Sequence, residues 1–280
     1  MPPMVTVVGA GRMGQGLARA LNVAGWRVRL YARHPDRVPA GPVAAVGDLP
    51  AALAGAGLVL VAVPDDAIPE VARAIRAAAP AEGLVVLHLS GTRDRTALSV
   101  LEGRAAGLGS FWPIQALADP AVAAAHWTGA FAGLEGDAAA LAAGERLAGA
   151  LGMAPVCIPS EAKPLVHAGA VMTGNYVVTL LAAAEQVAVA AGVEPTAAAR
   201  MYLPLARSAV ENVSVLGVVR ALTGPVARGD QGTVRAHLEA LSGASRELYV
   251  RLGLETLALA ERQGLPAERA AEVRRVLEGR

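Results

Sequence analysis

Short apolar runs alternate with alanine-rich amphipathic stretches over the first part of the chain. The runs are continuous and apolar, as expected for strands that a parallel sheet buries on both faces. Strands are predicted at residues 5–8, 28–31, 58–63, 84–89 and 155–158, with weaker signals at 43–46 and at 128–134, a candidate antiparallel edge. Helices are predicted at residues 13–24, 49–55, 67–79 and 138–150. This alternation predicts an α/β fold with a doubly wound parallel sheet.

The pattern changes after residue 159, where only helical periodicity remains. Helices are predicted at residues 161–191, 195–215, 231–241, 246–263 and 267–277. We therefore expect two domains, a doubly wound domain over residues 1–159 and an all-helical domain over residues 160–280.

Composition narrows the class of protein. With 54% hydrophobic and 18% charged residues, the 280-residue chain is not a disordered one. A net charge of +1, from 25 basic and 24 acidic side chains, gives no basic footprint for nucleic acid. A single cysteine, Cys157, and a start that runs directly into a strand lead us to expect a cytoplasmic protein. No metal site is expected.

Residues 164–184 carry no formal charge and raise the question of a membrane span. His167, Thr173, Gly174, Asn175 and Thr179 interrupt the stretch, and the chain has one such segment. We therefore predict a buried helix of a large core or of a subunit interface rather than a membrane helix. Because the far side of this helix needs cover, a homodimer through the C-terminal helices is expected.

A glycine motif follows the first predicted strand and opens the first predicted helix. Gly9 permits the tight turn, Gly11 lets the backbone approach a pyrophosphate, and Gly14 allows close packing of helix and strand. Arg12 and Met13 lie between the last two glycines, at the helix N-terminus where unpaired N–H groups attract phosphate. In this context the motif predicts a dinucleotide site.

The end of the second predicted strand indicates which dinucleotide binds. An NAD site places an acidic side chain here, about 20 residues after the motif. This chain instead has Arg33, and the first acid is Asp36. Because a guanidinium suits a 2′-phosphate, we expect NADP; the alternative is that Arg33 and Arg37 are ordinary solvated charges.

Two more loops at the carboxyl ends of strands are expected to line the same crevice. Pro64, Asp65 and Asp66 follow one strand, and Ser90 follows the next. Ser90 is a candidate to hold the nicotinamide amide or a substrate carboxylate. For the two aspartates we favour the role of a helix N-cap.

The chain contains 24 arginines and one lysine, Lys163. A lysine kept against such a bias indicates a site where arginine does not serve, since an ammonium in a cleft can exchange a proton and a guanidinium cannot. His167 lies one helical turn further on, so both side chains are predicted to address one substrate as a proton-donating dyad. The alternatives are a surface lysine and a hydrogen-bonded core histidine.

Two further residues are weaker candidates for substrate contacts. Asn175 would lie about 18 Å along a continuous helix from Lys163, too far to share a small substrate with it. It is therefore kept outside the expected catalytic core. Arg228 lies in a segment, residues 223–230, that reads either as a carboxylate clamp or as plain turn and cap chemistry.

The segments GAGRMG, EAKPLVHAGAVMTGNYV and LTGPVARGD together resemble bacterial Rossmann-like proteins with an all-helical C-terminal domain of unassigned function. These are relatives of deazaflavin-dependent NADP oxidoreductases, pyrroline-5-carboxylate reductases and enzymes like 6-phosphogluconate dehydrogenase. The resemblance implies an NADP-binding fold and a helical dimerisation domain. It also suggests a branched 2-oxo acid, as in ketopantoate reductase, as one candidate substrate.

The chain departs from the family pattern at two positions. Hydroxyacid dehydrogenases and ketopantoate reductases pair a lysine with an asparagine four residues later, where this chain has His167. The family also tends to carry a histidine where Trp112 stands. Both departures bear on the substrate.

The sequence leads us to expect an NADPH-dependent oxidoreductase that reduces a small carbonyl or imine substrate, with Lys163 as proton donor and His167 assisting. An alternative is a non-catalytic NADP-binding protein with a regulatory or scaffolding role. A third, a deazaflavin-linked hydride shuttle, requires a second cofactor cavity that no residue here identifies.

Overall fold

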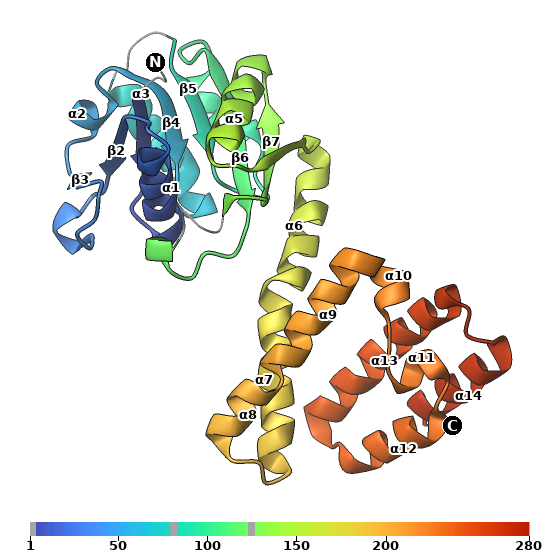
Figure 1. Cartoon of the computed structure of the whole chain (residues 1–280). Coiled ribbons are helices and arrows are strands. Elements are labelled where there is room, and N and C mark those ends of the chain that lie inside the picture. The colour runs from blue at the N-terminus through green and yellow to red at the C-terminus, as the bar shows by residue number, and fades with distance from the viewer. Residues whose placement is uncertain (1–3, 79–82, 123–126, 280) are drawn as a thin grey trace. The chain divides into compact units, whose positions relative to one another are not determined.

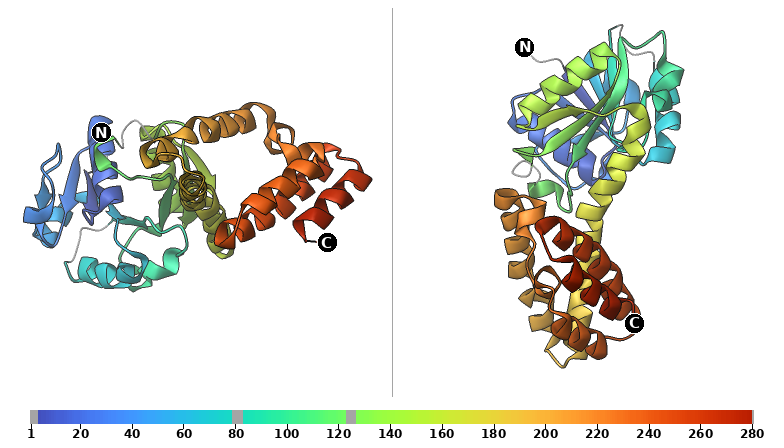
Figure 2. Two further views of the ribbon diagram at one scale, coloured as in Figure 1. Left: turned by 90° about the horizontal axis from the view of Figure 1, so that it is seen from below. Right: turned by 90° about the vertical axis from the view of Figure 1, so that its right-hand side faces the viewer.

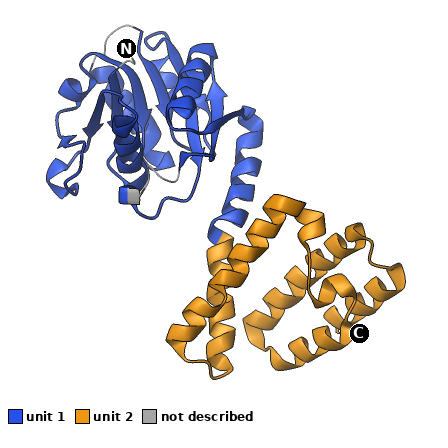
Figure 3. Cartoon of the chain, in the orientation of Figure 1, with its two compact units in different colours: residues 1–175 blue, residues 176–280 orange. Residues whose placement is uncertain are grey.

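The computed structural model describes residues 4–78, 83–122 and 127–279. The chain divides into two compact units, Met1–Asn175 and Tyr176–Arg280 (Figure 3). In the described residues the last strand ends at Cys157 and only helical elements follow. The change from sheet to helix thus falls near residue 159, while the compact units divide further along, within the helical segment.

Unit 1 contains one sheet, and its described strands number eight, in the order β3-β2-β1-β4-β5-β6-β7-β8. The pairing is parallel throughout except between β6 and β7. This confirms the predicted doubly wound architecture. The strands are β1 (Met4–Val8), β2 (Val28–Tyr31), β3 (Ala45–Val46), β4 (Ala56–Val61), β5 (Val85–His88), β6 (Gly107–Ile114), β7 (Phe131–Gly136) and β8 (Ala154–Cys157).

Helices cover both faces of this sheet (Figures 1 and 2). α1 (Arg12–Val23) and α5 (Ala138–Ala150) pack on one face, and α3 (Ile68–Ala77) and the 3-10 segment η3 (Arg95–Leu101) pack on the other. A short helix, α2 (Leu49–Leu53), adds Leu53 to the second core. Alternate residues of β4 enter the two cores, which is why the central strands read as unbroken apolar runs. The predicted end of the third helix, Ala79, lies outside the described residues.

One strand was not predicted. β6 contains Gly107, Gly109 and Pro113, residues that are poor strand formers. Pro113 is tolerated because it lies beyond Ser110, the last residue of β6 that pairs with β5. The strand is therefore stabilised by its two neighbours rather than by its own sequence.

The antiparallel strand was predicted at the edge of the sheet, and this is wrong. β7 is antiparallel to β6 as expected, but β8 pairs with its other side. β8 is the edge strand, and its residues Pro155 to Cys157 are exposed rather than buried on both faces.

The predicted helix at 161–191 is broken. α6 (Lys163–Thr173) ends at Gly174 and α7 (Asn175–Ala190) begins directly after it. Segment Ser160–Ala190 is long and apolar enough to cross a membrane by length and composition, and its most apolar stretch is 0% buried. The helix is therefore not buried in the core of the chain, which was one of the two kinds of burial predicted for it; burial at a subunit interface stays a prediction.

The helices of unit 2 surround a core of their own. Val226, Val234, Leu257 and Val273 are among its buried residues, contributed by four different helices. The remaining helices are α8 (Pro195–Met201), α9 (Leu203–Leu216), α10 (Val218–Ala221), α11 (Pro225–Arg228), α12 (Gln231–Ala240), α13 (Gly243–Gln263) and α14 (Ala267–Leu277).

Candidate active site

The glycine turn between β1 and α1 is built as the motif predicts. Gly9 has φ +112°, and a Cβ there would collide with the backbone carbonyl of Ala62, at the end of β4. A Cβ at Gly14 would collide with the carbonyl of Gly9. No atom lies within 4 Å of the position of a Cβ at Gly11, so the space beside this residue is open to a ligand.

A cavity of about 370 Å³ lies beside this turn, at the carboxyl ends of β1, β2 and β4. Arg33 and Arg37 both line it, together with Gly9, Gly11 and Pro64. The open space at Gly11 fits a pyrophosphate, and the two guanidinium groups fit a 2′-phosphate. These residues of the chain therefore suit NADP.

Two other residues of the motif lie at the N-terminus of α1. Arg12 is the first residue of that helix and its side chain is exposed. Met13 is half-buried and packs against the core on the α1 face of the sheet. Arg12 is thus accessible to a phosphate, whereas the Met13 side chain has a packing role.

The loop after β5 is held by the loop after β4. The Ser90 hydroxyl donates a hydrogen bond of 2.7 Å to Asp65 Oδ2, and the Thr92 hydroxyl donates one of 2.6 Å to the same oxygen. Burial raises the pKa of Asp65, but the hydrogen bonds from Thr92 and Ser90 outweigh it and leave the pKa below the ordinary value of 3.8. Asp65 is therefore a charged acceptor for the other loop.

The predicted role of the aspartates as helix caps is wrong. Neither carboxylate makes a capping hydrogen bond at the segment Asp65–Ala67. Asp65 is engaged by Ser90 and Thr92, and Asp66 forms an exposed ion pair of 3.2 Å with Arg93. Contacts between the two loops have replaced local capping.

His88, the last residue of β5, is fully buried beneath this loop. Its Nδ1 accepts a hydrogen bond from the backbone N–H of Ser90, and its Nε2 lies 2.9 Å from the carbonyl oxygen of Asp94. Burial lowers the pKa of His88 to about 4, so the imidazole is neutral at pH 7. A neutral ring with Nδ1 as acceptor and Nε2–H as donor satisfies both contacts.

Lys163, the only lysine, is buried with 1% of its surface exposed. Its Nζ donates hydrogen bonds to the Ser110 hydroxyl at 2.7 Å and to the Ser90 carbonyl at 3.2 Å. Burial lowers the pKa of the Lys163 ammonium below its ordinary value, and the carboxylates of Glu135, Asp94 and Asp65 oppose this effect. The alternative of a surface lysine is thereby excluded.

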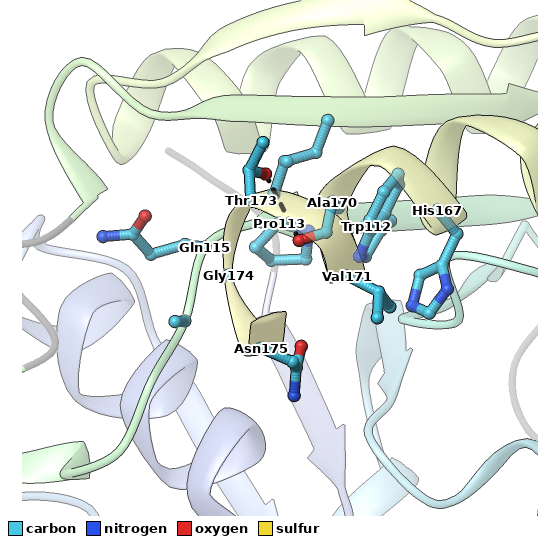
Figure 4. Close-up of a pocket in the computed structure, with 11 residues that line it drawn as sticks. Trp112, Pro113, Gln115, His167, Ala170, Val171, Thr173, Gly174 and Asn175 are labelled. Carbon is cyan, nitrogen blue, oxygen red and sulfur yellow. Dashed lines mark hydrogen bonds between the residues drawn. The ribbon is translucent and has the colours of Figure 1, made fainter. Parts of the chain in front are cut away.

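A second cavity, of about 300 Å³, lies beside α6 (Figure 4). Trp112 and His167 stand side by side on its wall, with ring centroids 5.3 Å apart. Gln115 and Asn175 also line the cavity, and among the described lining residues none is an arginine, lysine, aspartate or glutamate. The cavity thus combines apolar walls with several polar groups, and such a combination suits a small molecule.

A glycine at the end of the β5 loop makes this wall possible. A Cβ at Gly91 would collide with the ring of His167 and would lie 2.6 Å from Cε2 of Trp112. Gly91 is adjacent to Ser90, whose carbonyl receives the Lys163 ammonium. In this loop Ser90 therefore accepts a hydrogen bond from Lys163, and the next residue, Gly91, packs against the aromatic wall of the cavity.

The structure separates the predicted dyad. His167 lines the cavity, but Lys163 is buried and is not among the lining residues. Direct contact of both side chains with one substrate is therefore not what this conformation provides. The reason is that Lys163 begins α6 and its side chain enters the interior of unit 1, where Ser110 and the Ser90 carbonyl bind it.

Asn175 was kept apart from Lys163 as a weaker candidate for a substrate contact, and it lines the cavity together with His167 (Figure 4). Lys163 is not among the described lining residues, so the structure gives Asn175 and Lys163 no shared cavity. Arg228, in unit 2, is exposed at the end of α11. Around it Gly229 adopts the left-handed conformation and Asp230 caps α12, so the turn and cap chemistry is present.

Ser110 and Glu135 were not predicted as site residues from the sequence. Both are buried, Ser110 accepts a hydrogen bond from Lys163, and Glu135 is the next residue in the same hydrogen-bonded chain. Glu135 Oε2 accepts a hydrogen bond of 3.3 Å from the Ser110 hydroxyl. A signal was present, since an acid within the apolar run FAGLEG has to find a buried partner. Its partner lies on β6, the strand that the sequence did not predict.

These features define a class: a Rossmann-type dinucleotide-binding domain with a small-molecule cavity at the carboxyl ends of its strands, followed by a helical domain. Residues 4–90 match the family model described as NADP oxidoreductase, coenzyme F420-dependent. Residues 130–256 match a domain of unknown function, DUF2520. The chain thus matches an NADP oxidoreductase domain followed by a DUF2520 domain, which confirms the expected relationship and the expected cofactor class.

Individual relatives extend this result. A curated glycerol-3-phosphate dehydrogenase [NAD(P)+] of Moorella thermoacetica is 35% identical over 105 residues, which are 31% of this chain and 31% of that protein. The chain therefore matches about a third of the curated relative's length. Among solved structures, a candidate NADP oxidoreductase of Bacteroides fragilis has a TM-score of 0.69 at 22% identity and covers 93% of this chain and 97% of its own.

A pyrroline carboxylate reductase of Plasmodium falciparum, solved with NADP bound, has a TM-score of 0.60 at 13% identity and covers 99% of this chain and 96% of its own. At such identities the likeness establishes the fold. The substrate of this chain is assigned by none of these relatives.

Proposed function

We propose that this protein is an NADPH-dependent reductase of a small carbonyl or imine compound, such as a 2-oxo acid or a cyclic imine. The observation that carries the proposal is that unit 1 has two cavities at the carboxyl ends of its strands, one that reaches the end of β4 and one lined by the end of β6, with β5 between these two strands in the sheet. The glycine-turn cavity reaches the end of β4, and the loop after β5 contacts the wall of the Trp112 cavity.

NADPH, when bound, would supply the hydride. Gly9, Gly11, Arg33 and Pro64 would hold its nucleotide part, and Ser90 would lie near the nicotinamide because β4 and β5 are neighbours. Reduction of a carbonyl or imine leaves negative charge on oxygen or a lone pair on nitrogen, which requires a proton.

His167 and Lys163 would divide the work of supplying that proton. His167 lines the cavity and is the group placed to orient the substrate or donate to it. Lys163 donates two of its three N–H bonds to the chain, which leaves one N–H behind the wall of the cavity. Asn175 would contribute an amide to the substrate.

The test is single-turnover oxidation of NADPH with a panel of 2-oxo acids and cyclic imines. We expect oxidation with at least one compound, and a loss of at least about tenfold in the rate for Lys163→Ala and for His167→Ala at unchanged NADPH affinity. Glu145→Gln, on an exposed part of α5, is the matched control and is expected to leave the rate unchanged. Tight NADPH binding with no oxidation of any compound would favour the non-catalytic alternative.

A homodimer through the C-terminal helices belongs to the same proposal. Exposed apolar side chains along α7 and α9 support it, among them Val178, Leu205, Val210 and Val215. Surfaces of this kind are typical of subunit interfaces. Sedimentation equilibrium is expected to give twice the chain mass, and a monomer at micromolar concentration would overturn the dimer.

A further inference from the structure

A connected set of buried polar side chains lies inside unit 1. Lys163 is 1% exposed, Ser110 is 2% exposed and Glu135 is 6% exposed. Ser110 and Glu135 face each other as partners in the antiparallel register of β6 and β7. Burying polar groups to this degree destabilises the folded state unless the groups form hydrogen bonds with one another. The hydrogen bonds among these three side chains are therefore part of what stabilises the fold.

The three side chains form a directed hydrogen-bond chain. The Lys163 ammonium donates to the Ser110 hydroxyl at 2.7 Å, and that hydroxyl donates to Glu135 Oε2 at 3.3 Å. The other carboxylate oxygen, Oε1, accepts from the backbone N–H of Arg95 and from the Ser160 hydroxyl, each at 3.2 Å. A hydroxyl is donor and acceptor at once, so Ser110 joins a cation and an anion without direct contact between them.

Other ionisable groups face Lys163 as well, from the neighbouring elements. Asp65, before α3, already accepts from Ser90 and Thr92, and Asp94 accepts from Thr96. His88, on β5, is neutral at pH 7. Glu135 is the carboxylate that shares a hydrogen-bonded bridge with the ammonium, and it acts on Lys163 more strongly than the two aspartates do.

We propose that Glu135 is a positioning residue, which acts through the Ser110 hydroxyl as the counter-ion that keeps the Lys163 ammonium charged and directed at the Ser90 carbonyl. The ammonium then holds the loop whose next residue, Gly91, contacts Trp112 and His167. Its catalytic consequence rests on the proposed function, since this loop packs behind the Trp112 and His167 wall of the cavity in which the substrate is expected.

The single lysine makes a direct test possible. Protein labelled with ¹³C at lysine Cε, with a lysine-free purification tag, gives one lysine resonance, whose position against pH reports the charge of Lys163. Glu135→Gln keeps the shape of the side chain and removes its charge. We expect proton binding by Lys163 to weaken about tenfold in this variant, from the Coulomb energy across two hydrogen bonds. Glu145→Gln is expected to leave the titration unchanged.

Two further measurements keep the proposal testable if the Glu135→Gln variant does not fold. Ser110→Ala, which removes the bridge and retains both charges, is expected to weaken proton binding in the same direction. In the wild type the resonance is expected to indicate a charged amine at pH 7. An uncharged amine at that pH in the wild type, or a folded Glu135→Gln variant with the wild-type titration, would overturn the proposal. Because the titration needs no substrate, it can succeed where NADPH oxidation fails, and the two proposals fail separately.

Discussion

The two cavities of unit 1 differ in how the chain builds them. The glycine-turn cavity takes its lining from residues 8–11, 31–38 and 62–64, all in the first part of the sheet. The Trp112 cavity joins residues 112–116 to residues 167–175, and Gly91 packs behind its wall. Both cavities join distant segments of the chain, but the first is built around a glycine motif, whereas the second is built where β6 and α6 pack together. Substitutions in each should therefore have different consequences for binding and for turnover.

The largest expected effect separates two glycines of the motif. Gly9→Ala forces a side chain into a positive-φ conformation and against the Ala62 carbonyl, so we expect a loss of about 3 kcal/mol or more in the free energy of unfolding. Gly11→Ala meets no atom within 4 Å and is expected to change stability by less than about 0.5 kcal/mol, while weakening NADPH binding about tenfold. Urea unfolding and a fluorescence titration with NADPH measure both. Equal stability of the two variants would contradict this account of the turn.

Lowering the pH should destabilise the folded protein at His88, which is buried beneath the loop that packs against the second cavity. The pKa of His88 in the folded protein, about 4, lies below its ordinary value of 6.5, so the unfolded chain binds the proton first. The stability linked to the neutral His88 is therefore fully present above pH 6.5 and is lost as the pH drops from 6.5 to 4, by about 3 kcal/mol in all. Urea unfolding at several pH values measures the slope. His88→Gln is expected to flatten it and the exposed His34→Gln to leave it unchanged; the same slope in both variants would rule out His88 as its source.

Gly91→Ala should alter the second cavity and leave the first intact. The added methyl group would meet the rings of His167 and Trp112, and such overpacking costs about 1–3 kcal/mol of stability. NADPH affinity is expected to stay within about twofold, while turnover falls because the aromatic wall is displaced. Gly149→Ala, on α5 with no atom within 4 Å, serves as control and should be neutral or slightly stabilising. A matching loss of NADPH affinity in Gly91→Ala would show that the two cavities are not separable.

A smaller effect is expected at the cofactor-selective end. Arg33→Gln removes a guanidinium from the glycine-turn cavity, and we expect NADPH affinity to fall about tenfold while NADH affinity is unchanged. The exposed Arg73→Gln, on α3, should change neither. Titration of each variant with both nucleotides measures these affinities. An equal loss of affinity for NADPH and for NADH in Arg33→Gln would mean that Arg33 does not bind the 2′-phosphate.

The same contrast explains what the sequence could predict. The glycine motif, Arg33 and the alternation of elements depend on neighbours in the chain, and the fold they indicate is the fold observed. Lys163 was singled out by its rarity, but the direction of its side chain depends on Ser110 and Glu135. Ser110 lies on β6, which has no strand signature in the sequence, and Glu135 lies on β7, the strand that pairs with it. Asn175 was placed outside the expected catalytic core because of its distance from Lys163, and it lines the cavity with His167 while the Lys163 side chain enters the interior of unit 1. Contacts that need a register between distant strands are fixed only by tertiary structure.

We propose that the two cavities are two ends of one reaction site. A crystal structure of the protein with NADPH bound tests it most directly. The account predicts that the nicotinamide ring lies beside Ser90 and Gly91 and faces the cavity of Trp112 and His167. A nicotinamide directed away from the carboxyl end of β5, with that cavity untouched, would contradict it.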